Sequence, residues 1–193
     1  METSVSLLDA LRVGTDQQAW SKMVELYAPF IRQWLRVKGA AAHDIDDIVQ
    51  DVLSVVLRRL PEFEKQPHSG AFRGWLRTIT VNTIRNHWRT QNKHPTATGG
   101  SDFLSMINEL EDPHSQISKL WDLEHNTHVT RYLLDKVESQ FQPKTWQAFL
   151  QFAIEGNPAT QVADRLGISE NAVFIAKSRV MAELRKQGAG LID

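Results

Sequence analysis

The segment between Ala71 and Pro95 carries the residues best suited to chemistry with nucleic acid. Arginine and asparagine alternate there with tryptophan and phenylalanine, and no aspartate or glutamate interrupts them. Guanidinium groups bind phosphates, side-chain amides bind base edges, and aromatic rings stack on unpaired bases. The polar candidates fall on one predicted helix: Arg73, Arg77, Asn82, Arg85, Asn86 and Arg89. The segment predicts a site for phosphates and unpaired bases, with Trp75 and Trp88 assigned to the core.

A second segment, Pro158 to Arg185, has the pattern of two helices joined by a tight turn. Gly167 is placed where a chain leaves a helix with positive φ, and Ser169 can cap the helix that follows. One face of the second helix is apolar. The opposite face is polar and partly apolar, as a helix that enters a DNA major groove requires. Its candidate DNA contacts are Asn171, Phe174, Ile175, Lys177, Ser178 and Arg179.

A third segment is acidic and begins at Asp44. Asp46 and Asp47 in the first turn of a helix interact favourably with its dipole. A polar stripe continues down the outward face through Asp47, Gln50, Asp51 and Ser54, with Arg58 one turn later. This stripe fits a helical protein partner, and it fits an ordinary solvated face equally well.

Composition limits the function classes. The 193-residue chain has no cysteine, which excludes disulfides, thiolate zinc sites and cysteine nucleophiles, and which fits a reducing cytoplasm. No apolar run approaches the roughly 20 residues that span a bilayer, and we expect no membrane insertion. The formal net charge is only −1, but acidic and basic residues occur in separate blocks. Different surfaces should therefore bind different partners.

Apolar residues recur with helical periodicity and strand signals are weak, so the chain is predicted to be all-α, with two small helical domains joined by a flexible linker. Residues 1–94 form the first domain, 95–116 the linker with at most one weak turn of helix, and 117–193 a second domain ending in the helix-turn-helix. Helices are expected at 6–11, 16–37, 44–60, 71–89, 117–139 and 144–154, and in the hairpin. Asp44 is expected to cap its helix, and the loop 62–69 is long enough to form a lip over the start of the next helix, where a flipped base could bind.

Catalytic sites are poorly supported. His43 with Asp44 resembles the His–Asp pair of helical metal-dependent phosphohydrolases, but further ligands are lacking. His125 and His128 share one side of a helix near Asp122, and they are assigned to a polar surface. No phosphate loop or nucleophile elbow is present. We therefore expect no enzyme, no catalytic residue, no metal and no cofactor.

The order of these segments resembles the RNA polymerase sigma factors of the compact, two-domain extracytoplasmic-function group. The resemblance covers nearly the whole chain and rests on YAPFIRQWLR, DIDDIVQDVLSVVLRRL, FRGWLRTITVNTIRNHWR and the stretch from Thr145 to Arg185. It implies that Asp47, Gln50, Asp51 and Ser54 dock on bacterial core RNA polymerase. It also implies that the basic helix binds the −10 element, as duplex and as melted single strand, and that the hairpin reads the −35 element.

The resemblance further implies a cytoplasmic, nucleoid-associated protein, with an inhibitory anti-sigma protein as a further partner class. The main competing hypothesis is a stand-alone helix-turn-helix regulator whose N-terminal domain senses a signal or dimerises. Unpaired-base chemistry between Ala71 and Arg89 favours the sigma factor, because a regulator of closed duplex has no use for it. A stand-alone regulator should bind a duplex site tightly by itself, whereas a sigma factor should bind weakly until polymerase aligns its domains.

Overall fold

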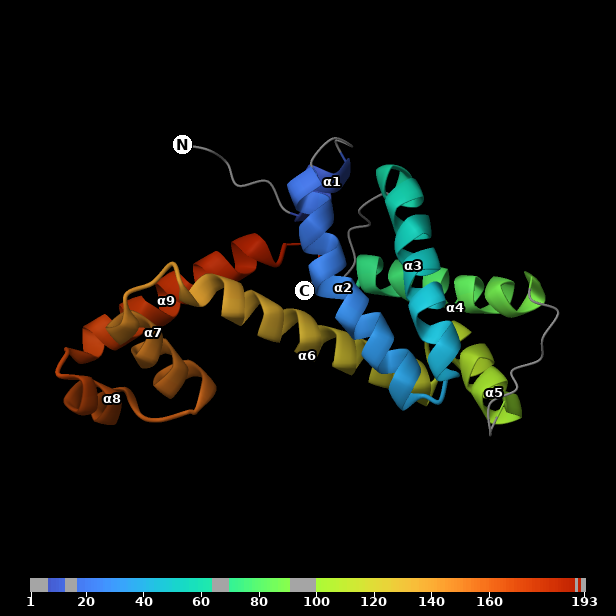
Figure 1. The fold of residues 1–193 in the computed structure, drawn as a ribbon. Helices are drawn as coiled ribbons and strands as arrows, with labels where there is room; N and C mark the ends of the chain where they lie inside the picture. The colour runs from blue at the N-terminus through green and yellow to red at the C-terminus, as the bar shows by residue number, and fades with distance from the viewer. Residues whose placement is uncertain (1–6, 13–16, 64–69, 91–99, 190, 192–193) are drawn as a thin grey trace. The chain divides into compact units, whose positions relative to one another are not determined.

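The protein is built from helices, which confirms the predicted all-α class (Figure 1). The computed structural model describes residues 7–12, 17–63, 70–90, 100–189 and 191. They fall into two compact units, one reaching from the N-terminal helix to Val129 and the other from Thr130 to Ala189. None of the described helices is long and apolar enough to cross a membrane.

The N-terminal unit begins with three helices: α1 (Leu7–Arg12), α2 (Gln17–Val37) and α3 (Ala42–Arg59). A short 3₁₀ helix, η1 (Leu60–Glu62), follows, and then α4 (Ala71–Thr90). Helix α2 packs on α3, and α3 packs on α4. The apolar stripe predicted for α2 is buried at Met23, Tyr27, Ile31 and Leu35, and Pro29 lies inside this helix without ending it.

Helix α5 (Gly100–Glu111) lies within the segment that the sequence suggested was a tether. It packs on α4, and Phe103 contacts the ring of Trp88 with ring centroids 5.2 Å apart. Phe103, Ile107 and Leu110 are buried, and their spacing of three to four residues gives α5 an apolar stripe. The expectation of at most one weak turn was therefore wrong, because this stripe lies among acidic and polar residues that resemble a linker. Residues 95–99 lie outside the described part.

Helix α6 (Gln116–Glu138) also differs from the expected division of the chain. Its first part contributes Trp121, His125 and Val129, all fully buried, to the N-terminal unit. The rings of Trp121 and Trp34 pack edge to face with centroids 5.0 Å apart. The two units therefore divide inside α6, after Val129, rather than between residues 95 and 116.

Asp44 does not cap α3, contrary to the prediction. The helix begins at Ala42, and the residue before it, Ala41, makes no side-chain capping bond. Asp44 instead lies buried in the first turn, with its Oδ1 3.4 Å from Nε2 of the buried His87 on α4. This polar contact connects α3 to α4, and it uses a histidine that lies 43 residues away in the chain.

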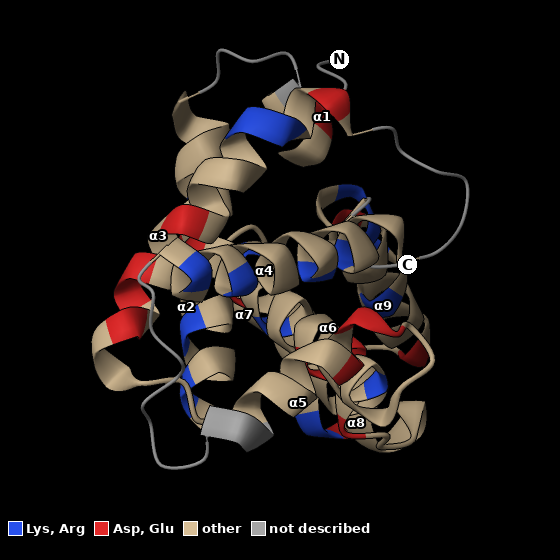
Figure 2. Ribbon diagram, turned by 90° about the vertical axis from the view of Figure 1, so that its right-hand side faces the viewer, with Lys and Arg blue, Asp and Glu red and all other residues tan. Residues whose placement is uncertain are grey.

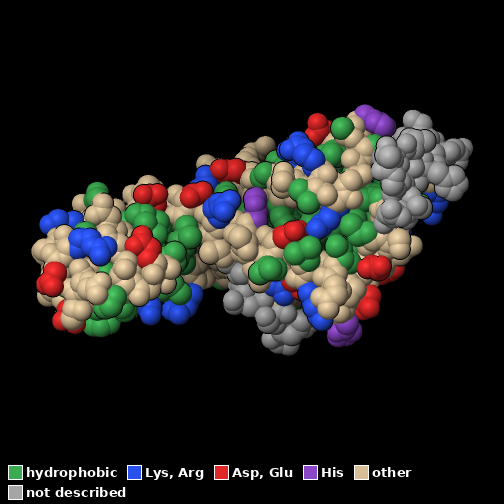
Figure 3. Space-filling model, turned by 90° about the horizontal axis from the view of Figure 1, so that it is seen from below, with side chains coloured by type: hydrophobic (Ala, Val, Ile, Leu, Met, Phe, Trp, Pro, Cys, Tyr) green, Lys and Arg blue, Asp and Glu red, His purple; other side chains and the backbone are tan. Residues whose placement is uncertain are grey.

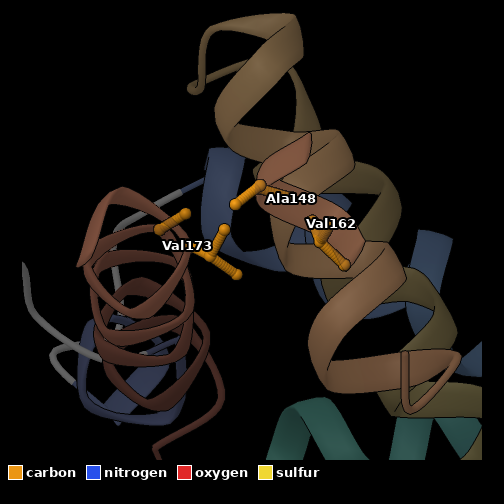
Figure 4. Packing of buried hydrophobic residues seen from close by; sticks show 5 residues of the cluster. Ala148, Val162 and Val173 are labelled. Atoms are coloured by element: carbon orange, nitrogen blue, oxygen red, sulfur yellow. The ribbon is translucent and has the colours of Figure 1, made fainter. Parts of the chain in front are cut away.

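The C-terminal unit contains the rest of α6, α7 (Pro143–Phe149), the π-helix η2 (Leu150–Ile154), α8 (Ala159–Leu166) and α9 (Glu170–Gln187). Ala148, Val162 and Val173 meet in its core, one from each of α7, α8 and α9 (Figure 4). Gly167 ends α8 with φ 63°, in the left-handed region that glycine adopts without strain. Ser169 caps α9 by accepting a hydrogen bond from the Ala172 amide at 3.2 Å. The expected turn chemistry at both positions is confirmed.

Candidate nucleic-acid interface

The arginines of α4 divide into two groups with different surroundings. Arg73 and Arg77, near its start, face the first part of α6. The Asp122 carboxylate on α6 lies 3.0 Å from Arg73 Nε and accepts a hydrogen bond from Arg77 Nη1 at 3.2 Å. Arg73 also donates to the Asn126 side chain at 2.9 Å, and Arg77 is only 8% exposed. These two candidate DNA contacts are therefore engaged within the protein.

The second group lies farther along α4 and is accessible. Asn82, Asn86 and Arg89 are exposed and Arg85 is half-buried, and Arg89 donates to the Asn86 side chain at 3.0 Å. Together with the end of α3 they line a groove of about 800 Å³. The other residues of its lining are Val55, Arg58, Arg59, Glu62, Ile79 and Thr83. In Figure 2 the acidic residues of α3 are red and the basic residues of α4 are blue.

No local pattern in the sequence places Arg58 and Arg59 beside α4. Arg58 fell at the end of the polar stripe of α3 and Arg59 was not singled out. The available signal was a pair of arginines two residues before Pro61, at the end of a helix whose other charges are acidic. Only the packing of α3 on α4 reveals that these arginines share a groove with Arg85 and Arg89.

Arg85 connects this groove to α5. Its Nη2 donates to the Asn108 side chain at 2.8 Å and to Glu111 Oε2 at 2.9 Å. The hydrogen bond from Arg85 and the charge of its guanidinium lower the pKa of the Glu111 carboxyl. Both partners of Arg85 come from the segment that was expected to be a tether.

A second hollow, of about 560 Å³, lies at the start of α4. Phe63, Gly70 and Trp75 are among the residues that line it, and Trp75 packs against Phe63 with ring centroids 5.0 Å apart. The lip for a flipped base was expected in the adjoining loop. Residues 64–69 of that loop lie outside the described part of the chain. Trp88, at the other end of α4, is buried in the core as expected.

The polar stripe of α3 is exposed throughout, at Asp47, Gln50, Asp51 and Ser54. Within the stripe, Asp51 Oδ2 lies 3.7 Å from Nδ1 of His87, and the Ser54 carbonyl oxygen accepts a hydrogen bond from Arg58 Nε at 3.3 Å. Leu57, half exposed, extends the stripe by one turn. The stripe is therefore available to a partner and combines carboxylates with one apolar side chain.

His125 and His128 were wrongly assigned to a polar surface. His125 is fully buried, and its Nε2 lies 3.2 Å from the Tyr27 hydroxyl. His128 Nε2 lies 2.7 Å from the carbonyl oxygen of Leu26. Both therefore hold the first part of α6 to α2. Among the described residues, no group of three or more His, Asp or Glu side chains is arranged to hold a metal ion.

On α9 all the candidate DNA contacts are exposed: Asn171, Phe174, Ile175, Lys177, Ser178 and Arg179. Phe174 and Ile175 are each about half exposed, which is unusual for large apolar side chains of a helix whose other face is core. The Phe174 ring meets Phe152 edge-on at 5.3 Å, and Lys177 Nζ lies 5.3 Å from the centroid of the same Phe152 ring. These contacts orient an apolar and a cationic side chain toward solvent.

Figure 3 shows how charge is distributed over one face of the molecule. Basic side chains lie there among acidic and hydrophobic ones, and the described residues of this face form no large patch of one sign. With a net charge of −1, long-range attraction to DNA is weak. Any attraction to DNA would therefore have to come from local groups of basic side chains.

The chain is similar to known proteins in sequence. Residues 23–94, which include α3 and α4, match the family described as Sigma-70 region 2. The RNA polymerase sigma factor HrpL of Pseudomonas syringae pv. syringae is 28% identical over 174 residues, covering 89% of this chain and 85% of that protein.

Two solved structures are also similar. CnrH, in complex with the cytosolic domain of CnrY, has 22% identity and a TM-score of 0.38, with 92% of each chain covered. The RsbN–BldN complex gives 15% identity and a TM-score of 0.34, covering 92% of this chain and 96% of the other.

Proposed function

We propose that the chain, which is similar to RNA polymerase sigma factors, is one of the extracytoplasmic-function group that directs transcription initiation, and that three of its helices divide the task. Helix α3 docks on core RNA polymerase, α4 binds the −10 element as it melts, and α9 binds the −35 element. The observation that carries this proposal is that α3 and α4 lie inside the sigma-70 region 2 match and expose, side by side, a carboxylate stripe and an Asn/Arg groove.

For the −10 element we propose Asn82, Arg85, Asn86 and Arg89 as contacts. Asparagine amides can pair with base edges, and arginine binds the phosphates between them. Arg73 and Arg77 are assigned differently. Because both pair with Asp122 and Arg77 is nearly buried, their role is to hold α6 against α4 rather than to bind DNA.

Strand separation needs no catalytic group in this scheme. Bases captured from the opening duplex offset the cost of unstacking, which is a few kcal/mol per step. The polymerase performs RNA synthesis, so the chain itself acts as a binding protein, in the cytoplasm and at the nucleoid.

For the −35 element we propose that α9 enters the major groove. Asn171, Ser178 and Arg179 can bind base edges and phosphates there, while Phe174 and Ile175 offer apolar surface to thymine methyl groups. The exposure of these two apolar side chains supports this assignment, because a solvated face would be expected to carry polar residues.

The test is run-off transcription with sigma-free bacterial core polymerase on a genomic promoter library. We expect promoter-specific transcripts that disappear with Asp47→Arg/Asp51→Arg, which reverses charge on the stripe, and with Arg85→Gln/Arg89→Gln. A matched control is Asp135→Arg/Glu138→Arg, which makes the same charge change on exposed positions of α6.

Co-purification with core polymerase separates the two sites. The Asp47→Arg/Asp51→Arg protein should lose core binding, whereas the Arg85→Gln/Arg89→Gln protein should keep it and fail only at the promoter. Tight binding of the free chain to a duplex site, with no transcript and no core binding, would instead support the stand-alone regulator.

A further inference from the structure

The C-terminal end of α3 carries a cationic surface that the division of labour above leaves unused. Arg58 and Arg59 are exposed and line the groove together with Arg85 and Arg89 of α4. Glu62 is the only acidic residue among the lining side chains of the described chain. The groove therefore has an excess of positive charge although the whole chain has a net charge of −1.

Most of this charge has no acidic partner in the described part of the chain. Arg85 is held by Glu111, but no carboxylate of the described residues lies within ion-pair distance of Arg58, Arg59 or Arg89. Arg58 Nε donates to the carbonyl oxygen of Ser54 at 3.3 Å, which holds the side chain close to the helix and leaves its terminal nitrogens for another acceptor. Guanidinium groups gathered in one groove repel each other, and a bound polyanion would remove that repulsion.

We propose that the α3–α4 groove binds successive phosphates of the melted promoter strand, with Arg58 and Arg59 as contacts. This inference rests on the function proposed above and extends the promoter site from α4 onto α3. Phosphate is the shared chemistry of a DNA strand and of a free nucleotide. The strand is favoured because the groove is continuous with Asn82 and Asn86, and because its lining residues in the described chain include no aromatic ring that could stack on the base of a nucleotide.

The proposal gives α3 two roles that differ in charge. Asp47 and Asp51 near its start are acidic and face a protein partner, whereas Arg58 and Arg59 at its end are basic and face DNA. Because like charges repel, the acidic start of α3 disfavours DNA, and its basic end disfavours a basic surface of the protein partner.

The experiment measures binding of holoenzyme to a fluorescently labelled single strand that carries the −10 element, over a range of salt concentrations. Each variant is held in excess over core polymerase. The test pair is Arg58→Gln/Arg59→Gln. The matched control is Arg36→Gln/Arg131→Gln, which removes the same charge from exposed positions outside the groove.

We expect the slope of log K against log salt to become shallower by about 1.4 in the test pair, since each single-strand phosphate contact contributes about 0.7. If the affinities converge near 1 M salt, this slope corresponds to an affinity loss of roughly 25-fold at 0.1 M. The control pair should keep the slope, and so should Arg58→Lys/Arg59→Lys, which retains the charge.

Several results would overturn the proposal. An unchanged slope in the test pair, together with a reduced slope in Arg85→Gln/Arg89→Gln, rejects the α3 contacts and leaves the proposed function intact. Unchanged slopes in both pairs reject the −10 assignment of α4 as well. Loss of core binding by the test pair but not by the control pair assigns Arg58 and Arg59 to polymerase docking. Saturable binding of ATP to the full chain that the test pair abolishes, without a change in the DNA slope, makes the groove a nucleotide site.

Discussion

The ion pairs of Asp122 provide the sharpest test of how α4 uses its arginines. We expect Asp122→Asn, which keeps the shape of the side chain and removes its charge, to destabilise the N-terminal unit without weakening promoter binding. The variant would leave the nearly buried Arg77 without a carboxylate partner, while Arg73 would keep its hydrogen bond to Asn126.

The expected loss of stability in Asp122→Asn follows from the burial of Asp122 and Arg77. Removing one member of a fully buried ion pair costs about 3–5 kcal/mol, and an exposed pair contributes about 0–1 kcal/mol. The Arg77 side chain is 9% exposed and that of Asp122 is 32% exposed, so this pair lies between the two limits. We expect a loss of about 2 kcal/mol in the free energy of unfolding, which lowers the melting temperature by roughly 5–10 °C in a unit of this size.

Tryptophan fluorescence during thermal unfolding is the appropriate assay. Trp34, Trp75, Trp88 and Trp121 belong to the N-terminal unit, whereas Trp146 lies in the core of the C-terminal unit. The matched control is Asp135→Asn, an exposed position on the same helix, which should change stability by at most about 0.5 kcal/mol.

One result would refute the assignment of Arg73 and Arg77 to holding α6. If Asp122→Asn left the unfolding transition unchanged and the holoenzyme bound the −10 strand more tightly, Asp122 would be shielding DNA contacts. The two arginines would then return to the promoter site.

Three further predictions concern other contacts. Burial raises the pKa of Tyr27, so the folded state keeps the phenol proton at a pH where the unfolded chain loses it. The free energy of unfolding is therefore unaffected by this group below the ordinary pKa of about 10, and it falls as pH rises above that value. Tyr27→Phe should remove this loss of stability at alkaline pH, and it should lower stability by about 1 kcal/mol at neutral pH because it breaks the contact with His125. Urea unfolding at pH 7 and pH 11 measures the two effects, and an equal loss of stability at pH 11 in the variant would contradict the assignment. The Arg85 guanidinium holds the pKa of Glu111 below its usual range, so the α4–α5 contact is favoured above the usual carboxyl pKa and is lost as pH falls through the lowered one; an NMR titration should find the ordinary pKa in Arg85→Gln. Gly167→Ala should destabilise the C-terminal unit by about 1 kcal/mol through backbone strain in the left-handed region alone, because no atom lies within 4 Å of an added Cβ. Gly167→Asn should lose less stability, and equal losses of stability in thermal melts of the two variants would point to another cause.

The sequence predicted those elements whose signals are local. Helix α4 was expected at 71–89 and is found at Ala71–Thr90, since its apolar residues recur at helical spacing. Gly167 and Ser169 were assigned correctly because a left-handed helix end and a capping hydroxyl each depend on neighbouring residues only. The accessible parts of the candidate sites on α3, α4 and α9 were found in the same way, since the outward face of an amphipathic helix follows from its periodicity.

The predictions that were wrong concern residues whose partners lie far away in the sequence. His125 was read as a surface residue because its neighbours Glu124, Asn126 and Thr127 are polar, but it packs against Tyr27, 98 residues earlier in the chain. Asp44 was read as a cap because capping is local, whereas its actual partner is His87. Arg77 looked free to bind DNA because no acid lies near it in sequence, and its partner Asp122 is 45 residues away. Pairings at such distances leave no mark on local periodicity.

Helix α3 runs without a glycine or proline from Ala42 to Arg59, and it ends where Pro61 follows. At a rise of about 1.5 Å per residue, Asp47 and Arg58 are separated by about 16.5 Å along its axis, and the intervening chain makes just over three full turns at about 3.6 residues per turn, so both lie on nearly the same side. An unbroken helix of this kind fixes both the distance and the rotation between its two ends. If the polymerase binds one end and the opened strand binds the other, α3 sets the distance between the polymerase surface and the site of strand opening. Even a small insertion in α3 would then shift or abolish strand opening.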